Sequence, residues 1–499
     1  MASLINRNWV FGSGARLDFS TAVAPPSTAL PTPSSGTAIG LAGWREGCAS
    51  ISDANGQLVL YTDGNTVWDG ANIVVASGLL GDRSCTQSAI IVPDPGNPRR
   101  YYVFTTGERL TNNHVDGIRI DTGTSPWTVV PLSSILTLPT TGSPTEKLTA
   151  IQHANCRDFW VLTVVQDTSD PANPALLRVF LVTPAGVQHV TPDLPMNAQV
   201  EDIGYLKGSG DGKRIALANF LGHTVLVYPF DTSTGTIDPS GLVTITVPPI
   251  KKHDRLAYGV EFSPNGKLLY ISVVDNPPGD PQADGYVFQY DLLAGTLFSA
   301  PAWIHQNADQ AEYALGALQR GMDDRIYIAQ DGEDRLGVIE YPDVPGAGCN
   351  LTFGALTLAP GSRCWMGLPN LIPNPCECAC ACEEGNCDEA VEHANQTLDA
   401  RADGKHFTIN ANGQPAAGRC RPAFEQREFA PLFSLHWGDG ASDRFESHDT
   451  EVVYIRAHNP WRNLVYRGLK IFNIRVTPNQ ALPDGEKALQ LVPAEIVCF

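Results

Sequence analysis

Hydrophobic and polar positions of this chain alternate in short runs that are separated by turns. The clearest unit is YGVEFSPNGKLLYISVV, which starts at Tyr258 and is followed by GYVFQYDLLAG. The same order of strand, turn and strand starts again at Asp202 and Tyr313. Four units carry a glycine at the same place, namely Gly204, Gly259, Gly316 and Gly367. Alternation with period two, broken by Asn, Asp and Gly, predicts antiparallel hairpins rather than helices.

Looser copies of the unit start at Gly47, Thr86 and Leu148. A unit of about four strands that recurs roughly every 40 to 60 residues is typical of β-propeller blades. A seventh start at Cys364 has no hairpin after it, whereas residues 8–20 resemble later strands without a first strand. Pairing these two ends closes a ring and removes exposed sheet edges. The sequence therefore predicts an all-β protein in which residues 1–373 form a seven-bladed propeller, with six blades as the alternative.

The periodicity ends in PNPCECACACEEGNCDEA, where proline and closely spaced cysteines interrupt it. This break predicts a Cys-rich connector over residues 374–424. Alternating apolar runs return after it, as in PLFSLHW, EVVYIRAH and KALQLVPAEIVCF. Several short strands within about 75 residues are typical of a small immunoglobulin-like β-sandwich, which we predict for residues 425–499.

Charge narrows the range of partners. The formal net charge is -19, so long-range repulsion disfavours nucleic acid and anionic membrane surfaces. No apolar stretch approaches the length of a membrane-spanning helix, and MASLINRNWV lacks the pattern of a signal peptide. We therefore expect synthesis in the cytoplasm, no membrane insertion, and a protein or glycan partner.

Residues from about 8 to 373 resemble the N-terminal propeller-like regions of surface and gliding-associated proteins of the Bacteroidota. The resemblance lies in GCASISDANGQLVLYTDGNTVWDG and TQSAIIVPDPGNPRRYYVFTTG, while SPNGKLLYIS resembles the blade motif of YVTN and WD40-type propellers. It implies a non-enzymatic propeller in an extracellular or particle-associated setting. Without a leader pattern, the analogy extends to a component or cargo of a phage-like particle, such as a contractile injection system, released by lysis or firing.

Nine of the twelve cysteines lie between Cys349 and Cys498. Five of them crowd the connector as Cys376, Cys378, Cys380, Cys382 and Cys387. In an extended segment the first four project to one face, where thiolates bind Zn or Cu(I). Two alternatives remain, free reduced thiols and disulfides. The possible disulfide partners are Cys349, Cys364, Cys420 and Cys498.

Charged residues stand just before the start of each repeat. In a propeller these positions share one mouth of the central channel, so they predict a charged rim. The rim arginines are Arg45, Arg83, Arg255 and Arg363. Arg45, Arg83 and Arg363 are expected on adjacent loops, where they would form a pocket for an anion or a carboxylate. The structural alternative is ion pairing with Glu46, Glu201 and Glu312.

An enzymatic alternative rests on His153, Asp202 and Glu261, which lie in or near predicted first strands. Such residues serve as metal ligands or acid/base groups in a propeller hydrolase or lactonase. The favoured interpretation is that they are polar residues whose hydrogen bonds are satisfied within the fold. The chain contains no nucleophile elbow, HExxH, P-loop or dinucleotide fingerprint. Our leading hypothesis is therefore a non-enzymatic binding or structural protein that its C-terminal domain anchors to an assembly.

Overall fold

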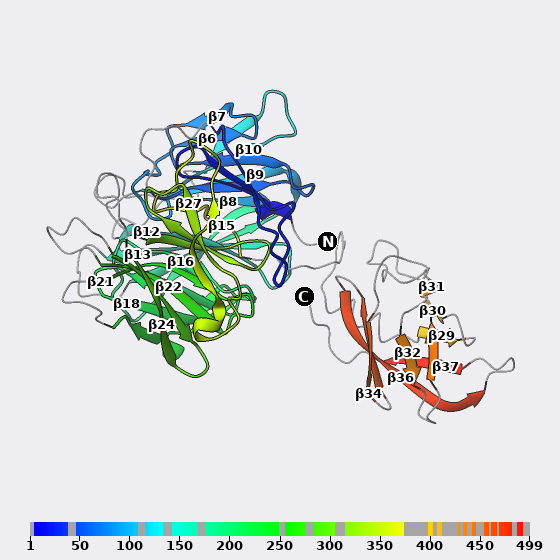
Figure 1. Ribbon diagram of the computed structural model, residues 1–499. Coiled ribbons are helices and arrows are strands. Elements are labelled where there is room, and N and C mark those ends of the chain that lie inside the picture. The colour runs from blue at the N-terminus through cyan, green and yellow to red at the C-terminus, as the bar shows by residue number, and fades with distance from the viewer. Residues whose placement is uncertain are drawn as a thin grey trace. The chain divides into compact units, whose positions relative to one another are not determined.

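The computed structural model describes residues 4–37, 46–107, 115–132, 142–167, 175–248, 255–275, 284–304 and 315–373, together with nine strands between Leu398 and Val492. Contacts divide the chain into two units (Figure 1). One unit is Ser3–Pro375 and the other holds Cys376–Phe499 with the first two residues. Over the ranges just given, no helix has the length and hydrophobicity that spanning a bilayer requires.

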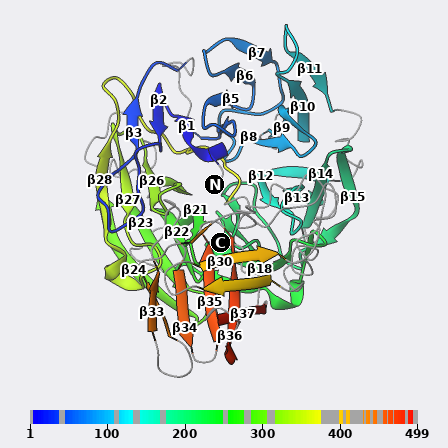
Figure 2. The same cartoon turned by 90° about the vertical axis from the view of Figure 1, so that its right-hand side faces the viewer.

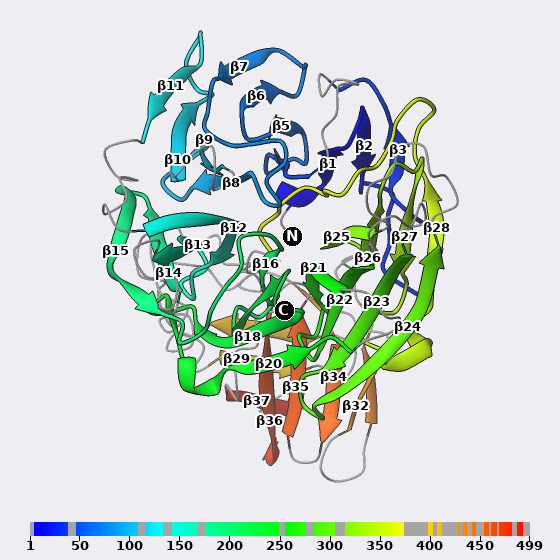
Figure 3. The same ribbon diagram turned by 90° about the vertical axis from the view of Figure 1, so that its left-hand side faces the viewer.

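Residues 3–375 form a ring of seven antiparallel β-sheets around a central axis (Figure 3). In each complete sheet the first strand lies nearest the axis and later strands follow outward. Each sheet is therefore one blade, and the seven-bladed propeller is confirmed over the six-bladed alternative.

Blades 1 to 3 have four strands each. These are β4 (Ala49–Ser52), β5 (Leu58–Thr62), β6 (Thr66–Asp69) and β7 (Val74–Ser77); β8 (Ala89–Asp94), β9 (Asn97–Thr106), β10 (Val115–Asp121) and β11 (Thr128–Pro131); β12 (Gly142–Gln152), β13 (Phe159–Asp167), β14 (Leu176–Thr183) and β15 (Gly186–Pro195).

Blades 4 to 6 repeat this plan, except that two short strands, β19 and β20, both pair with β18 in blade 4. The strands are β16 (Leu206–Gly208), β17 (Arg214–Asn219), β18 (Thr224–Asp231), β19 (Thr236–Ile237) and β20 (Val243–Thr246); β21 (Arg255–Phe262), β22 (Leu268–Asp275), β23 (Asp284–Asp291) and β24 (Thr296–Ile304); β25 (Leu315–Arg320), β26 (Ile326–Gln330), β27 (Arg335–Ile339) and β28 (Leu351–Thr357). Short 3-10 turns cover η1 (Leu4–Asn6), η2 (Pro239–Gly241) and η3 (Gly346–Cys349).

Blade 7 joins the two ends of the propeller sequence. Its N-terminal part is β1 (Asn8–Phe11), β2 (Ala15–Asp18) and β3 (Thr32–Ser34). Ser13 and Arg363 exchange two backbone hydrogen bonds, of 2.9 and 3.0 Å. The Trp365 indole N–H donates to Ser13 Oγ at 2.7 Å, and Asn6 Nδ2 donates to the Ile372 carbonyl at 2.8 Å. The unfinished seventh repeat is thus completed by the N-terminus, as its sequence predicts.

The recurring glycines lie where first strands crowd around the axis. A Cβ atom on Gly316 would lie 2.0 Å from the Met366 carbonyl oxygen, and one on Gly259 would lie 2.8 Å from the Gly316 carbonyl. A Cβ on Gly367 would lie only 1.6 Å from the Glu46 carbonyl. These contacts are with backbone, which cannot move aside cheaply, so the glycine register reflects the packing of neighbouring blades.

Aromatic packing joins blades 6 and 7. Trp9 and Phe19 lie with their ring centroids 4.8 Å apart, and each contacts the edge or face of Tyr327 at 5.5 and 5.6 Å. All three side chains are buried within the largest core cluster of the described residues. Such pairs contribute about 0.5 to 1.5 kcal/mol each beyond the area that they bury.

A buried arginine reinforces the same junction. Arg325 of blade 6 is 1% exposed and pairs with Asp323 at 3.0 Å. Its guanidinium also donates to the carbonyls of Val23, at 2.8 Å, and Ser27. Both carbonyls belong to the connection between β2 and β3, so one side chain holds a long segment of blade 7 against blade 6.

The second unit also consists of β-strands. They are β29 (Leu398–Ala402), β30 (Phe407–Ala411), β31 (Glu428–Phe429), β32 (Phe433–His436), β33 (Ser442–Phe445), β34 (Tyr454–His458), β35 (Trp461–Tyr466), β36 (Leu469–Ala481) and β37 (Lys487–Val492). Seven of them form one sheet in the order β31-β30-β29-β37-β36-β35-β34, and β32 pairs with β33. Because β29 and β30 pair into this sheet, strands begin inside the range predicted as connector. The immunoglobulin-like sandwich stays a prediction.

Candidate functional site

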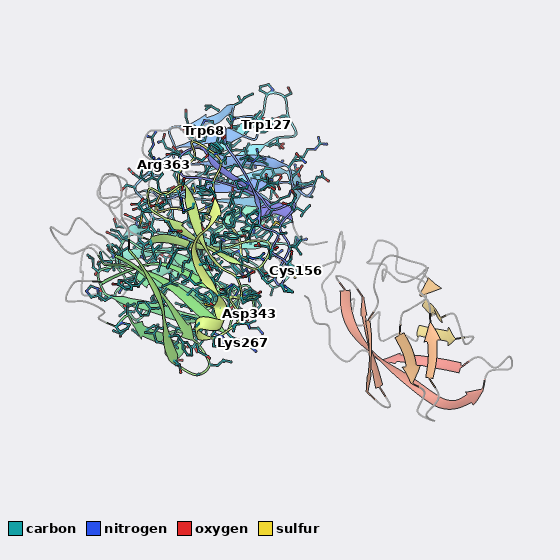
Figure 4. The ribbon with its side chains drawn as sticks, in the orientation of Figure 1. Trp68, Trp127, Cys156, Lys267, Asp343 and Arg363 are labelled. Carbon is teal, nitrogen blue, oxygen red and sulfur yellow. The ribbon has the colours of Figure 1, made fainter. Side chains whose placement is uncertain are left out.

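The central channel has two mouths. We call the end at which the first strands begin the front mouth, and the end at which they finish the rear mouth. Figures 2 and 3 view the ring along its axis from opposite sides, and Figure 4 shows Arg363 and Cys156 on opposite faces. Arg363 precedes a first-strand segment, whereas Cys156 lies in the turn after β12, so the two residues mark the front and the rear.

Glu146 lies near the front mouth, at the bulge in β12. Its carboxylate accepts hydrogen bonds from the backbone N–H and the hydroxyl of Thr86, at 2.9 and 2.7 Å. The side chain is buried, and that burial raises the pKa of Glu146 despite both hydrogen bonds. This carboxylate therefore links blades 2 and 3 rather than standing open to a ligand.

The neighbouring Lys147 is fully buried and donates to three backbone carbonyls. They belong to Glu201, Asp202 and Ile203, at 2.8, 3.0 and 2.7 Å. An ammonium has three donors, so this arrangement uses all of them. Burial lowers the pKa of Lys147 to about 8, against the opposing effect of nearby carboxylates. Lys147 thus fixes the connection from blade 3 to blade 4.

Two amides cross the middle of the channel. Gln87 Nε2 donates to the Leu206 carbonyl at 3.0 Å and to Asn370 Oδ1 at 3.3 Å. Asn370 Nδ2 in turn donates to the carbonyls of Ala89 and Leu148, at 3.0 and 2.6 Å. The pair therefore connects blades 2, 3, 4 and 7.

Charged side chains gather again at the rear mouth. Glu261 of β21 is 4% exposed, and its Oε2 accepts from the Arg320 backbone N–H at 3.1 Å. Lys207 Nζ lies 3.7 Å from the same oxygen and donates to Gln319 Oε1. Burial lowers the pKa of Lys207, while Glu261 opposes the shift. The Glu261 carboxylate thus lies between the Lys207 ammonium and the Arg320 backbone N–H.

A small recess opens beside these charges, with a free volume of about 20 Å³. Its lining combines polar and apolar groups from blades 5, 6 and 7. It is lined by Asn6, Glu261, Gln319, Arg320, Gly321, Met322, Ile372 and Pro373. This volume holds a water molecule or one small polar group rather than a sugar ring.

The rim arginines that the sequence indicates have different surroundings. Arg83 pairs with the buried Asp63 at 3.7 Å, and the exposed Arg363 donates to the Gly332 carbonyl at 2.9 Å. Arg255 opens β21, where its backbone pairs with Asp275. Arg45 lies outside the described residues, so the predicted three-arginine pocket stays a prediction.

The three residues of the enzymatic alternative do not converge. His153 lies in the turn after β12, at the rear, where its ring stacks on Trp160 with centroids 5.0 Å apart and its Nδ1 accepts from the Asn155 N–H. Burial lowers the pKa of His153. Asp202 lies near the front mouth and Glu261 near the rear mouth. Among the described residues, no three His, Cys, Asp or Glu side chains are arranged to hold a metal ion.

The cysteine cluster Cys376 to Cys387 lies outside the described residues. Two of the disulfide partners considered for it, Cys349 and Cys364, are buried free thiols here. Burial raises the pKa of both, which disfavours the thiolate. Neither of them is bonded to the connector in this structure.

Sequence reasoning missed Lys207, Gln319 and Asn370. Each stands three positions after a register glycine, in the sequences that follow Gly204, Gly316 and Gly367. A polar residue at this fixed place in a first strand was the available signal, because equivalent positions in successive blades face equivalent neighbours.

No protein-family profile matches this chain, and neither does any curated protein. Solved structures do resemble it. A protein from Lactobacillus plantarum is 14% identical with a TM-score of 0.43, over 73% of this chain and 98% of that one. A putative 6-phosphogluconolactonase from Bacteroides fragilis is 14% identical with a TM-score of 0.45, over 72% and 96%. The Pseudomonas aeruginosa periplasmic gluconolactonase is 13% identical with a TM-score of 0.34, over 90% and 93%. At these identities the likeness concerns the fold alone.

Proposed function

We propose that this chain is a binding protein whose partner surface is the front face of the propeller. The observation that carries the proposal is a difference in the lengths of the connections. On the front face, second and third strands of blades 2, 3 and 5 are joined by eight residues each, over 107–114, 168–175 and 276–283, whereas those of blades 1, 4 and 6 are joined by three or four. On the rear face, first and second strands of blades 1, 4, 5 and 6 are joined by five residues each, over 53–57, 209–213, 263–267 and 321–325. Two rear connections are longer, 19–31 and 340–350; Arg325 holds the first, and the second contains the 3-10 turn η3.

Long connections on a rigid scaffold can vary without disturbing the blades, which is why binding residues concentrate on them. The rear turns are instead tied down by their own side chains. Asp53 Oδ1, for example, accepts from the N–H groups of Asn55 and Gln57, at 2.9 and 2.8 Å. The buried Lys147 ties down the front connection from blade 3 to blade 4 through the carbonyls of residues 201–203. This combination favours recognition of a protein or a glycan by the front face.

The test compares one charge reversal on each face. Arg363→Glu changes an exposed side chain at the front, and Lys267→Glu changes an exposed side chain in a rear turn (Figure 4). The protein is screened against a glycan array and by crosslinking capture in extracts, and each hit is quantified with both variants. We expect Arg363→Glu to weaken binding about tenfold, as loss of a charged contact does, and Lys267→Glu to leave it unchanged. A ligand lost only with Lys267→Glu would contradict the proposal.

The second candidate is a hydrolase or lactonase that acts in the channel. The observation that favours it is the rear recess, where the buried carboxylate of Glu261 lies beside the ammonium of Lys207. Hydrolysis of a panel of lactones, measured by the protons that it releases, tests this candidate directly. Glu261→Gln should abolish such turnover, and equal activity in the variant would exclude Glu261 as its acid or base.

The sequence adds a proposal about residues 376–499, which we assign to anchoring the propeller in a larger assembly such as a phage-like particle. Removing them is expected to leave the affinity of the front-face ligand unchanged and to abolish co-sedimentation with particles. Continued co-sedimentation of the truncated protein would show that the propeller alone carries the attachment.

A further inference from the structure

Arg320 is a buried cation with an unused donor. It is 7% exposed, and its Nη1 donates to the Pro264 carbonyl at 3.4 Å. Its Nη2 is shielded from solvent and has no hydrogen-bond acceptor among the described residues. An orphaned guanidinium N–H costs about 1 to 3 kcal/mol or more, so such a group indicates a missing acceptor.

The surrounding residues position the Arg320 guanidinium before any ligand binds. A Cβ atom on Gly210 would lie 2.9 and 3.0 Å from Nη1 and Nη2, so the absence of a side chain there makes room for Arg320. The Arg320 backbone N–H donates to Glu261, and Arg320 is one of the residues that line the rear recess. A ligand group would therefore meet a donor that needs little reorganisation.

The carboxylate that lines the recess is already engaged. Glu261 is the carboxylate on the recess, and it already accepts from two backbone N–H groups while lying near Lys207. Asp324 also interacts with Arg320 electrostatically, although burial raises the pKa of Asp324, and no hydrogen bond from Arg320 Nη2 reaches it. Asn6 lines the recess too, and one of its two amide donors is taken by Ile372. Arg320 Nη2 is therefore a donor at this site for which the described residues supply no acceptor.

We propose that the rear mouth binds a small oxyanion, the carboxylate or phosphate group of a ligand, through Arg320. Guanidinium groups pair with carboxylate and phosphate through charge-assisted hydrogen bonds. The site lies on the opposite face from the proposed partner surface, so either proposal can fail without the other.

The experiment measures the melting temperature of the full chain against inorganic phosphate in one arm and acetate in the other, with chloride holding ionic strength constant. Arg320→Met removes the donor. The matched control is Arg214→Met, because Arg214 is half-buried on the same face and also donates to a backbone carbonyl, that of Gly266, at 3.3 Å. We expect a saturable rise in melting temperature for wild type and Arg214→Met, and at least about tenfold weaker binding for Arg320→Met.

Absence of saturable stabilisation by either anion would overturn the proposal, as would equal affinity in Arg320→Met and wild type. If only one of the two anions stabilises the protein, that result identifies the ligand group as a phosphate or as a carboxylate. If Arg320→Met does not fold, Met322→Glu decides, because Met322 is half-buried on the recess and a carboxylate there repels an anion. Unchanged affinity in Met322→Glu would then reject the site.

Discussion

Replacing Arg325 by methionine tests how strongly one side chain holds the ring closed. The change removes an ion pair with Asp323 and the hydrogen bonds to the Val23 and Ser27 carbonyls, yet keeps similar apolar bulk. Asp323 is 1% exposed, so the variant leaves a buried carboxylate with Tyr327 as its remaining side-chain donor, at 2.8 Å. Breaking a buried pair in this way costs about 3 to 5 kcal/mol.

The assay is urea unfolding followed by tryptophan fluorescence, since Trp9 packs against Tyr327 at the same junction. Arg335→Met in the same blade is the control, because its side chain is 49% exposed and pairs with Asp334 at the surface. Its expected cost is within about 0.5 kcal/mol. Adding Asp323→Asn to Arg325→Met removes the stranded charge and should recover part of the loss. Equal unfolding midpoints for Arg325→Met and Arg335→Met would refute the reasoning.

Three further predictions concern the channel and the ring. Deleting residues 1–20 removes β1 and β2 and should abolish the cooperative unfolding transition of the propeller in calorimetry; a transition like that of the intact protein would disprove closure by the N-terminus. Asn370→Ala strands the Ala89 and Leu148 carbonyls and should cost about 2 kcal/mol or more in urea unfolding, whereas Asn97→Ala, at a surface turn, should cost little. The pKa of Lys147 is lowered to about 8 in the folded state, so the unfolded chain binds more protons between pH 8 and the ordinary lysine pKa. The stability of wild type relative to Lys147→Met should therefore rise by up to about 3 kcal/mol across that range, and a flat difference would show that the ammonium is not buried as described.

The sequence was sufficient for the architecture because a propeller repeats its local signals. The glycines that share a register, such as Gly316 and Gly367, encode the close approach of neighbouring blades, and the unpaired ends at residues 8–20 and Cys364 encode closure. Both signals lie in short segments of sequence, and the glycine signal recurs in several blades.

The long-range side-chain contacts between blades could not be predicted in the same way. Gln87 meets Asn370 across 283 positions of sequence, and Arg325 meets Val23 across 302. Their partners are mostly backbone carbonyls, which carry no residue-specific signal. The separation of Asp202 at the front from His153 and Glu261 at the rear was unpredictable for a related reason, since nearness to a first strand does not tell which end of the strand a side chain occupies.

Because Ser13 pairs with Arg363, blade 7 can be completed only after nearly the whole propeller sequence has been synthesised. The first hairpin leaves the ribosome about 350 residues before the segment that completes its blade. At translation rates of about 5 to 20 residues per second, β1 waits roughly 20 to 70 s with an unpaired edge. An exposed edge strand is a template for pairing with other chains, so this interval is when the nascent protein is most exposed to aggregation and most dependent on chaperones.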